Sequence, residues 1–328
     1  MEIVADDDIK RYRVAGHIST KMEEAMILRS FPTTPPRTTA LTKINVIASS
    51  IPLSTARIIN LVVLSLGVSL NLLMIMVIFS KSSMRTTMNL YVVSFACSNM
   101  VILIEPLEDV LQWFFDTKLK LNMDYVCLIS FDVSVITIAI LKFQLYVNIF
   151  HRQTTFGQGL LRKTTAMKGI VLIWSACTIS IAIGLHIYDF FEGDMAEIYV
   201  WNTFMFIAPP IVIFLALDAL ILYELMILRE FEGSWRMNEI RQYVMLVIVA
   251  LAFLLIRTPY RVARAVNFIE PKASCCTENK REVLYFVAKM FPAIFPIIYM
   301  ALSCEFHGVV QETLRCRCRK SLKEIVDI

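Results

Sequence analysis

Seven long apolar stretches constrain this chain more than any other feature. Each contains about 20 or more mostly apolar residues, enough for a helix to cross the hydrocarbon layer of a membrane. Short polar or charged connectors separate them. The stretches cover residues 57–80, 88–112, 119–148, 168–188, 200–227, 242–268 and 283–303. The sequence therefore predicts an all-α membrane protein, a bundle of seven transmembrane helices.

Composition supports this prediction and argues against other classes. Hydrophobic residues make up 57% of the 328 positions and charged residues only 18%, whereas about a quarter of a typical globular chain is charged. No carboxylate pair, phosphate-binding loop or nucleophile triad indicates an enzyme, and the four histidines lack metal-ligand spacing. We expect no enzymatic activity, no cofactor and no nucleic-acid partner.

The distribution of lysine and arginine predicts the orientation of the bundle. With the N-terminus outside, the inner connectors and the C-terminal tail carry about 13 basic residues and the outer loops about four, which agrees with the positive-inside rule. We predict a multi-pass protein of the plasma membrane in three parts. These are a largely disordered extracellular tail over 1–56, the bundle over 57–303, and an amphipathic eighth helix with a short cytoplasmic tail over 304–328.

Two cysteines near the C-terminus are candidates for lipidation. Cys316 and Cys318 lie in "LRCRCRK", where the neighbouring cations would be attracted to anionic membrane lipid. Palmitoylation at both positions would hold the eighth helix at the membrane surface. The alternative is a pair of unmodified thiols.

Short motifs in consecutive stretches resemble those of the rhodopsin-like G-protein-coupled receptors across residues 57–318. "MRTTMNLYVVSFACSNM" is similar to the first inner loop and second helix of receptors for peptide hormones and neuropeptides. The other positions that match, in the family's order, are Asn71 in "GVSLN", Trp174, Pro210, Pro259 in "TPY", and Pro296 and Tyr299 in "FPIIY". The resemblance implies an extracellular ligand, expected to be a peptide, and a heterotrimeric G protein on the cytoplasmic face.

The chain departs from this family at the positions that form its activation switch. Ser134 is retained, but the second-helix aspartate and a seventh-helix asparagine are replaced by Asn99 and Phe295. The third-helix Asp-Arg-Tyr triplet reads "QLY", which is Gln144, Leu145 and Tyr146. Asp218 occupies the position of the fifth-helix tyrosine, and Arg257 that of the sixth-helix tryptophan. The scaffold is thus kept while the family's activation mechanism cannot be transferred residue by residue.

Several charges lie within the sixth and seventh stretches. Arg257, Arg261 and Arg264 are spaced i, i+4 and i+7 and so share one helix face. Lys289 precedes Pro296 by seven residues, on the face that in this family lines the ligand cavity, and Cys127 is expected to face the same cavity. An unpaired charge at membrane depth costs roughly 2.5–3.5 kcal/mol on insertion scales. We therefore expect these cations to have anionic partners.

Two interpretations of these cations remain open. In the first, they pair with Glu105, Asp109, Asp132 or the acidic loop at 189–199, and the resulting network only holds helices together. In the second, the cavity keeps surplus positive charge for the anionic group of a ligand, such as a peptide carboxylate or a lipid headgroup. The formal charges nearly balance, so the sequence does not decide between them.

Three functions follow from these observations. The leading hypothesis is an atypical rhodopsin-like receptor for a peptide or another ligand with an anionic group. A second is a receptor-like scaffold or decoy without signalling, suggested by "QLY", Asn99 and Arg257. A third is a retinal-binding photoreceptor, because Lys289 matches the opsin lysine that forms a Schiff base, with Glu105 or an acidic residue of an outer loop as the counterion.

Overall fold

The computed structural model describes residues 53–117, 123–191, 195–270, 278–303, 305–306 and 308–309. The chain divides into two units, Met1–Ala56 and Arg57–Ile328, and the description concerns the second. The predicted extracellular tail before residue 53, residues 192–194 of the acidic loop predicted at 189–199, and Cys316 and Cys318 lie outside the described residues. The predicted eighth helix is described only at four positions near its start.

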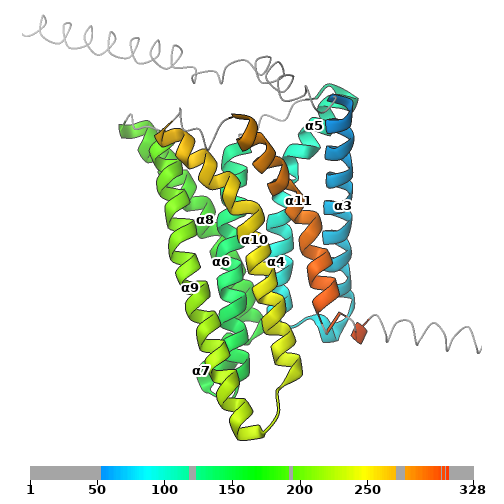
Figure 1. The fold of residues 1–328 in the computed structure, drawn as a ribbon, viewed down its shortest axis with the longest axis vertical. Helices are drawn as coiled ribbons and strands as arrows, with labels where there is room; N and C mark the ends of the chain where they lie inside the picture. Colours follow the sequence, from blue (N-terminus) through cyan, green and yellow to red (C-terminus); the bar gives the residue numbers. More distant parts are fainter. Residues whose placement is uncertain are drawn as a thin grey trace, which may run out of the picture. The chain divides into compact units, whose positions relative to one another are not determined.

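Long helices dominate the described part of the chain, in which no strand occurs (Figure 1). Seven spans are long and apolar enough to cross a membrane, so the prediction of a seven-span helical bundle is confirmed at this level. A 3₁₀ turn, Ser82–Met84, precedes α4. The helices are α3 (Leu53–Ser80), α4 (Thr87–Ile102), α5 (Ile104–Phe115), α6 (Met123–Phe150), α7 (Thr155–Leu160), α8 (Lys163–Phe191), α9 (Met195–Glu232), α10 (Met237–Ile269) and α11 (Glu278–Leu302).

The second span consists of two helices rather than the single one predicted over 88–112. It breaks at Leu103, between α4 and α5, because Pro106 has no N–H to donate and its ring conflicts with the carbonyl of Ile102. The Leu103 side chain packs closely on α3: a Cβ added at Gly67 would lie 2.7 Å from its Cδ1 atom. Glycine at this position thus allows α3 to approach the break.

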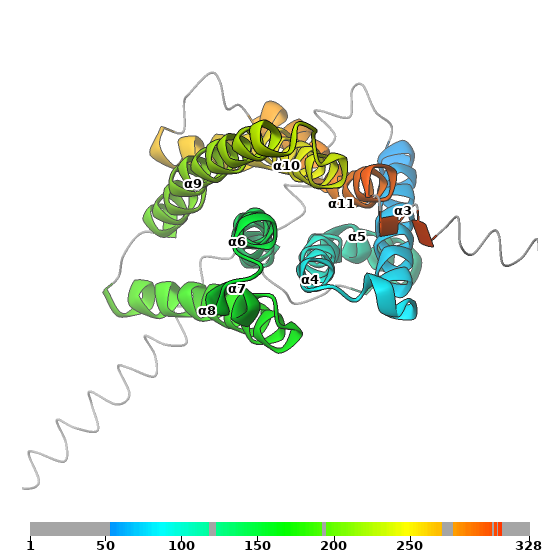
Figure 2. The ribbon, with the colours of Figure 1, turned by 90° about the horizontal axis from the view of Figure 1, so that it is seen from below.

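Helix α6 lies in the interior of the bundle and contacts α4, α8, α9 and α10 (Figure 2). Around it the core is aromatic: the Phe95 and Phe295 ring centroids are 4.5 Å apart, and those of Phe131 and Phe253 are 5.0 Å apart. Large apolar side chains are also exposed on the outside of the bundle, among them Leu172, Leu215 and Leu255. Such an apolar exterior is what a lipid-facing surface requires.

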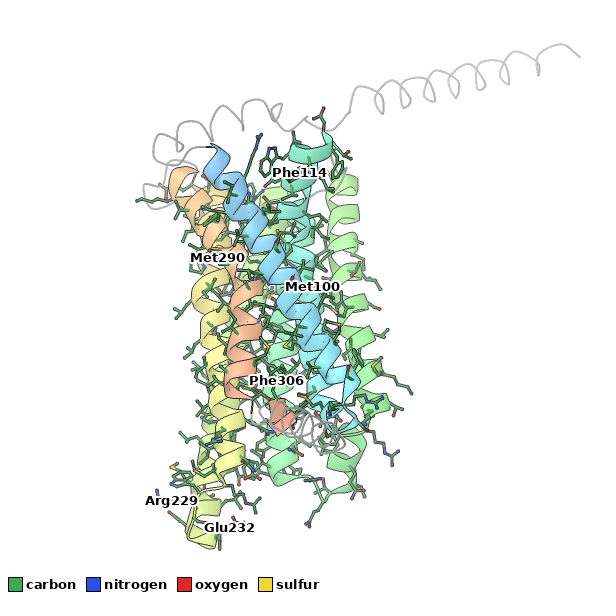
Figure 3. The ribbon with its side chains drawn as sticks, turned by 90° about the vertical axis from the view of Figure 1, so that its right-hand side faces the viewer. Met100, Phe114, Arg229, Glu232, Met290 and Phe306 are labelled. Carbon is green, nitrogen blue, oxygen red and sulfur yellow. The ribbon has the colours of Figure 1, made fainter. Side chains whose placement is uncertain are left out.

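The two ends of the bundle differ in the side chains they carry (Figure 3). Phe114 lies at one end, and Arg229 and Glu232 lie at the other. In keeping with the predicted orientation, the end with Phe114 is called the outer end and the end with Arg229 the inner end.

Candidate functional site: a buried polar network and a small pocket

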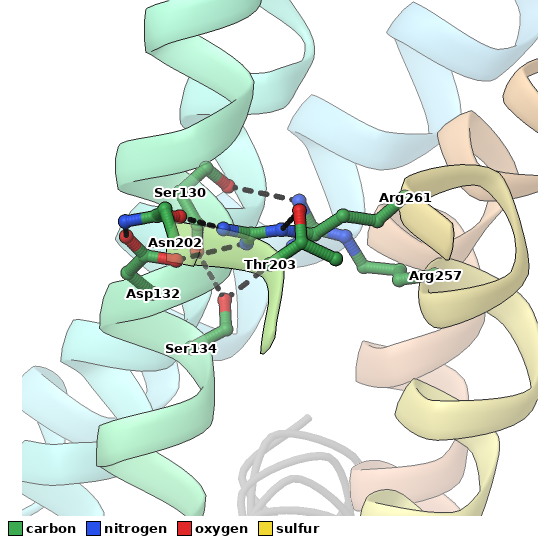
Figure 4. A network of polar contacts seen from close by, with 7 residues as sticks. All are labelled: Ser130, Asp132, Ser134, Asn202, Thr203, Arg257 and Arg261. Atoms are coloured by element: carbon green, nitrogen blue, oxygen red, sulfur yellow. Dashed lines mark hydrogen bonds and ion pairs between the residues drawn. The ribbon is translucent and has the colours of Figure 1, made fainter. Parts of the chain in front are cut away.

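A polar network joins α6, α9 and α10 inside the apolar bundle (Figure 4). Two of its members, Arg257 and Arg261, are one turn apart on α10, and both side chains are only 3% exposed. The remaining members are Ser130, Asp132 and Ser134 on α6 and Asn202 and Thr203 on α9. The shared face predicted for the two arginines therefore points into the protein.

Arg261 is the better satisfied of the two arginines. Its Nη1 atom lies 2.8 Å from Asp132 Oδ1 in an ion pair, and its Nε donates to Thr203 Oγ1 at 3.3 Å. It also donates to Asn202, whose amide in turn donates to the second Asp132 oxygen at 3.1 Å. The guanidinium carbon lies 4.2 Å from the Phe131 ring centroid. These contacts offset much of the cost of burying both charges.

Arg257 has a different environment. It donates to two hydroxyl oxygens, Ser130 Oγ at 3.2 Å and Ser134 Oγ at 3.4 Å, and its guanidinium lies 5.4 Å from the Phe253 ring centroid. Among the described side chains, no carboxylate oxygen lies within ion-pairing distance of it. Asp132 is nearby but already engaged by Arg261. Arg257 therefore keeps a positive charge that hydroxyls and rings stabilise only in part.

A pocket lies against these two arginines and is lined also by Cys127, Tyr260 and Tyr285. Its volume is only about 20 Å³, room for roughly one water molecule. The Tyr260 and Tyr285 rings, from α10 and α11, lie 4.4 Å apart between centroids, and Cys127 Sγ is 3.7 Å from the Tyr285 hydroxyl. We call this cavity the arginine pocket.

Lys289 and Arg264 do not line the arginine pocket, although each contacts one of its tyrosines. Lys289 Nζ lies 4.4 Å from the Tyr285 ring centroid and forms an ion pair with Glu105 at 3.1 Å. Arg264 Nη1 donates to the Tyr260 hydroxyl at 2.9 Å. The four cations predicted to share a pocket are thus divided. Two of them line the pocket, and the other two contact its tyrosines without lining it.

The predicted acidic partners are divided as well. Asp132 and Glu105 pair with Arg261 and Lys289, as the first interpretation of the charges expects. Asp109 accepts a hydrogen bond from Asn60 at 3.3 Å. Arg257 has no carboxylate partner among the described residues, so the first interpretation does not account for it.

The motif positions near the middle of the bundle mostly make interhelical contacts. Asn71 donates to the Pro292 carbonyl at 2.7 Å, and Trp174 donates to Ser94 at 3.0 Å. Ser134 lies 2.8 Å from Ser98, oxygen to oxygen. Asn99 is fully buried, and neither polar atom of its amide has a hydrogen-bond partner among the residues that the structure describes.

The proline positions lie within continuous helices. Pro210 is inside α9, Pro259 inside α10, and Pro296 inside α11, and none of them ends its helix. Phe295, beside Pro296, belongs to the aromatic core described above.

The motif positions near the inner end form a second group of contacts. Tyr299 donates to Asn89 at 2.7 Å, and Asn89 donates to Glu305 at 2.6 Å. In the "QLY" triplet, Gln144 donates to the Leu160 carbonyl at 3.4 Å and Leu145 is fully buried. Tyr146 lies 3.3 Å from a ring nitrogen of His151. The three residues of the triplet therefore contact nearby residues by hydrogen bonding and packing, and among the described residues they form no ion pair.

The sequence reasoning missed an ion pair between Lys142 on α6 and Asp218 on α9. The Lys142 side chain is 1% exposed and also lies 5.8 Å from the Phe214 ring centroid. Asp218 had been noted only as a departure from the receptor family. The missed signal was a lysine inside an apolar stretch, which implies an acidic partner on a neighbouring helix.

Comparisons with known proteins do not identify a family for this chain. No protein-family model matches the chain, and no curated protein matches its sequence.

Proposed function

We propose that this chain is an atypical rhodopsin-like G-protein-coupled receptor whose arginine pocket receives the anionic group of an extracellular ligand, expected to be a peptide. The observation that carries the proposal is Arg257, a buried cation without a carboxylate partner among the described residues, at the lining of a pocket between helices. A ligand carboxylate there would complete the charge pairing that Arg261 and Lys289 already have.

The small volume of the pocket gives a mechanism for coupling. A peptide terminus needs far more than about 20 Å³, so the adjacent Tyr260 and Tyr285 rings would separate before it reaches Arg257. These tyrosines belong to α10 and α11. Arg264 donates a hydrogen bond to Tyr260, and the Lys289 amine lies over the Tyr285 ring. Ligand entry would therefore change the spacing of α10 and α11, and a ligand that binds the open form would shift the equilibrium toward it.

The test is G-protein activation by the intact chain in cells, measured without ligand and with a peptide library in free-acid and amidated forms. A response that needs the free carboxylate and disappears in Arg257→Gln, with surface expression maintained, would support the proposal. Arg57→Gln removes one charge near the outer end but not from the pocket, and should leave the response intact. Absence of any response with every G protein would favour a scaffold or decoy instead.

A second candidate rests on the Lys289–Glu105 ion pair. Glu105 lies 3.1 Å from the lysine amine, where a counterion of a protonated retinal Schiff base would be needed. The enclosed volume beside Tyr285 is far too small for retinal without rearrangement. Reconstitution with 11-cis retinal tests this: a visible absorption band that Lys289→Met removes would support it, and no band would exclude it.

A further inference from the structure

A second and larger cavity opens at the inner end of the bundle, far along the helices from the arginine pocket. Its volume is about 470 Å³, within the range of roughly 300–1,000 Å³ usual for small-molecule sites. Arg85, Arg152 and Lys163 line it from three different segments: the connector before α4, the connector after α6, and the first residue of α8. We call it the inner cavity. Figure 2 views this end, where α4, α6, α7 and α8 approach one another.

The cations of the inner cavity are available for a ligand. In the part of the chain that the structure describes, Arg85, Arg152 and Lys163 make no ion pair and no side-chain hydrogen bond. Among its described lining residues the cavity has one carboxylate, Glu305, which accepts the hydrogen bond from Asn89. Three cations against one carboxylate give the cavity a net positive charge.

The remaining lining suits a polar ligand of several charges. Ser82, Ser83 and Thr86 bring hydroxyl groups into the lining beside Arg85. Thr87 donates to the Leu161 carbonyl at 2.6 Å and so fixes the start of α4 to the connector before α8. The three cations come from three segments, so a ligand with several phosphate groups on one ring offers each of them an anionic partner, which a single-charge anion does not.

We propose that the inner cavity binds a polyphosphorylated inositol group, either as the headgroup of a membrane phosphoinositide or as the soluble inositol polyphosphate. The predicted orientation places this cavity at the cytoplasmic membrane surface, where basic pockets between helices meet such headgroups. The inference does not depend on the proposed receptor function, because it concerns other residues and its test needs neither an extracellular ligand nor a G protein.

The test uses the purified full chain in nanodiscs. One arm measures the binding of soluble inositol trisphosphate in phosphatidylcholine nanodiscs. The other compares the thermal stabilisation given by phosphatidylinositol bisphosphate with that given by phosphatidylserine at equal charge density. We expect the phosphoinositide to stabilise the chain more. Binding of the trisphosphate would identify a soluble ligand as sufficient, and stabilisation by the lipid alone would identify the membrane source.

The decisive variant replaces Arg85, Arg152 and Lys163 by glutamine. With about a fivefold loss for each phosphate-contacting cation, binding should weaken about a hundredfold. The control removes three charges from the same end but outside the cavity, at Lys81, Arg162 and Lys168, and should bind almost as the unmodified chain does. If the triple variant does not fold, Arg152→Gln alone should weaken binding about fivefold. Equal loss in both variants, no preference over phosphatidylserine, or no binding would overturn the inference.

Discussion

Breaking the Arg261–Asp132 ion pair is the most informative perturbation of the bundle. The two charges are 2.8 Å apart and both side chains are nearly inaccessible. At an effective dielectric constant of about 20, their attraction is about 6 kcal/mol, much of which offsets their desolvation. Asp132→Asn leaves the arginine charge buried without its carboxylate. Losses of about 3–5 kcal/mol are usual when one partner of a buried pair is removed.

The assay is thermal unfolding of the full chain in one detergent, followed by tryptophan fluorescence. For a chain of this size the loss corresponds to a decrease in Tm of about 4–7 °C. The double variant Asp132→Leu with Arg261→Met removes both charges and should recover at least half of the decrease, because an apolar pair of similar volume replaces the ions.

An exposed ion pair provides the matched control. Arg236 and Glu232 form an i, i+4 pair on the surface of the inner end, so Arg236→Gln should change Tm very little. If Asp132→Asn lowers Tm no more than this control does, or if the double variant is less stable than the single one, the account of the buried network is wrong.

Three further predictions concern the other charged groups. Lys142→Met should lower Tm by several degrees, because it leaves Asp218 without its partner, and adding Asp218→Leu should restore most of the loss. Lys289→Met should also lower Tm, because it removes the lysine partner of Glu105. Glu105→Gln should lower Tm less, since the neutral amide still accepts a hydrogen bond from the lysine. Burial raises the pKa of the Glu305 carboxyl above its ordinary value of 4.5, so the folded chain holds this proton more tightly than the unfolded chain. The Glu305 contribution to stability should therefore decrease as pH rises above about 4.5. In Glu305→Gln, the profile of Tm against pH should no longer show this decrease.

The sequence predicts the bundle well because its signal is strong. A membrane span needs an apolar run of about 20 residues, so the seven stretches could be recognised without any tertiary contact. The break at Leu103 was harder to foresee. Pro106 carries the local signal for it, but Pro210, Pro259 and Pro296 lie within helices that continue. Whether a proline interrupts a span depends on its packing against neighbouring helices, which a single sequence does not give.

The candidate site could be predicted only in part. Helical spacing was enough to place Arg257 and Arg261 on one face, and the resemblance to the receptor family indicated that this face points inward. The partner of each cation depends on the rotation and height of neighbouring helices, which a single sequence does not determine. Asn202 and Thr203, which complete the contacts of Arg261, carry no charge or motif and so escaped notice. Lys142 could have been found, because a lysine inside an apolar run is a signal in itself.

The most direct test of the central claim uses Cys127 as a probe of the charge in the arginine pocket. In a variant with every other cysteine replaced by serine or alanine, the reaction rates of Cys127 with anionic and cationic methanethiosulfonate reagents are compared. Opening of the pocket is a fast pre-equilibrium common to both reagents and cancels in the ratio of their rates, so this ratio reports the local potential. We predict that the anionic reagent reacts about tenfold faster, and that Arg257→Gln removes most of the difference. Equal rates, or a faster cationic reagent, would contradict the claim that Arg257 leaves surplus positive charge in the pocket.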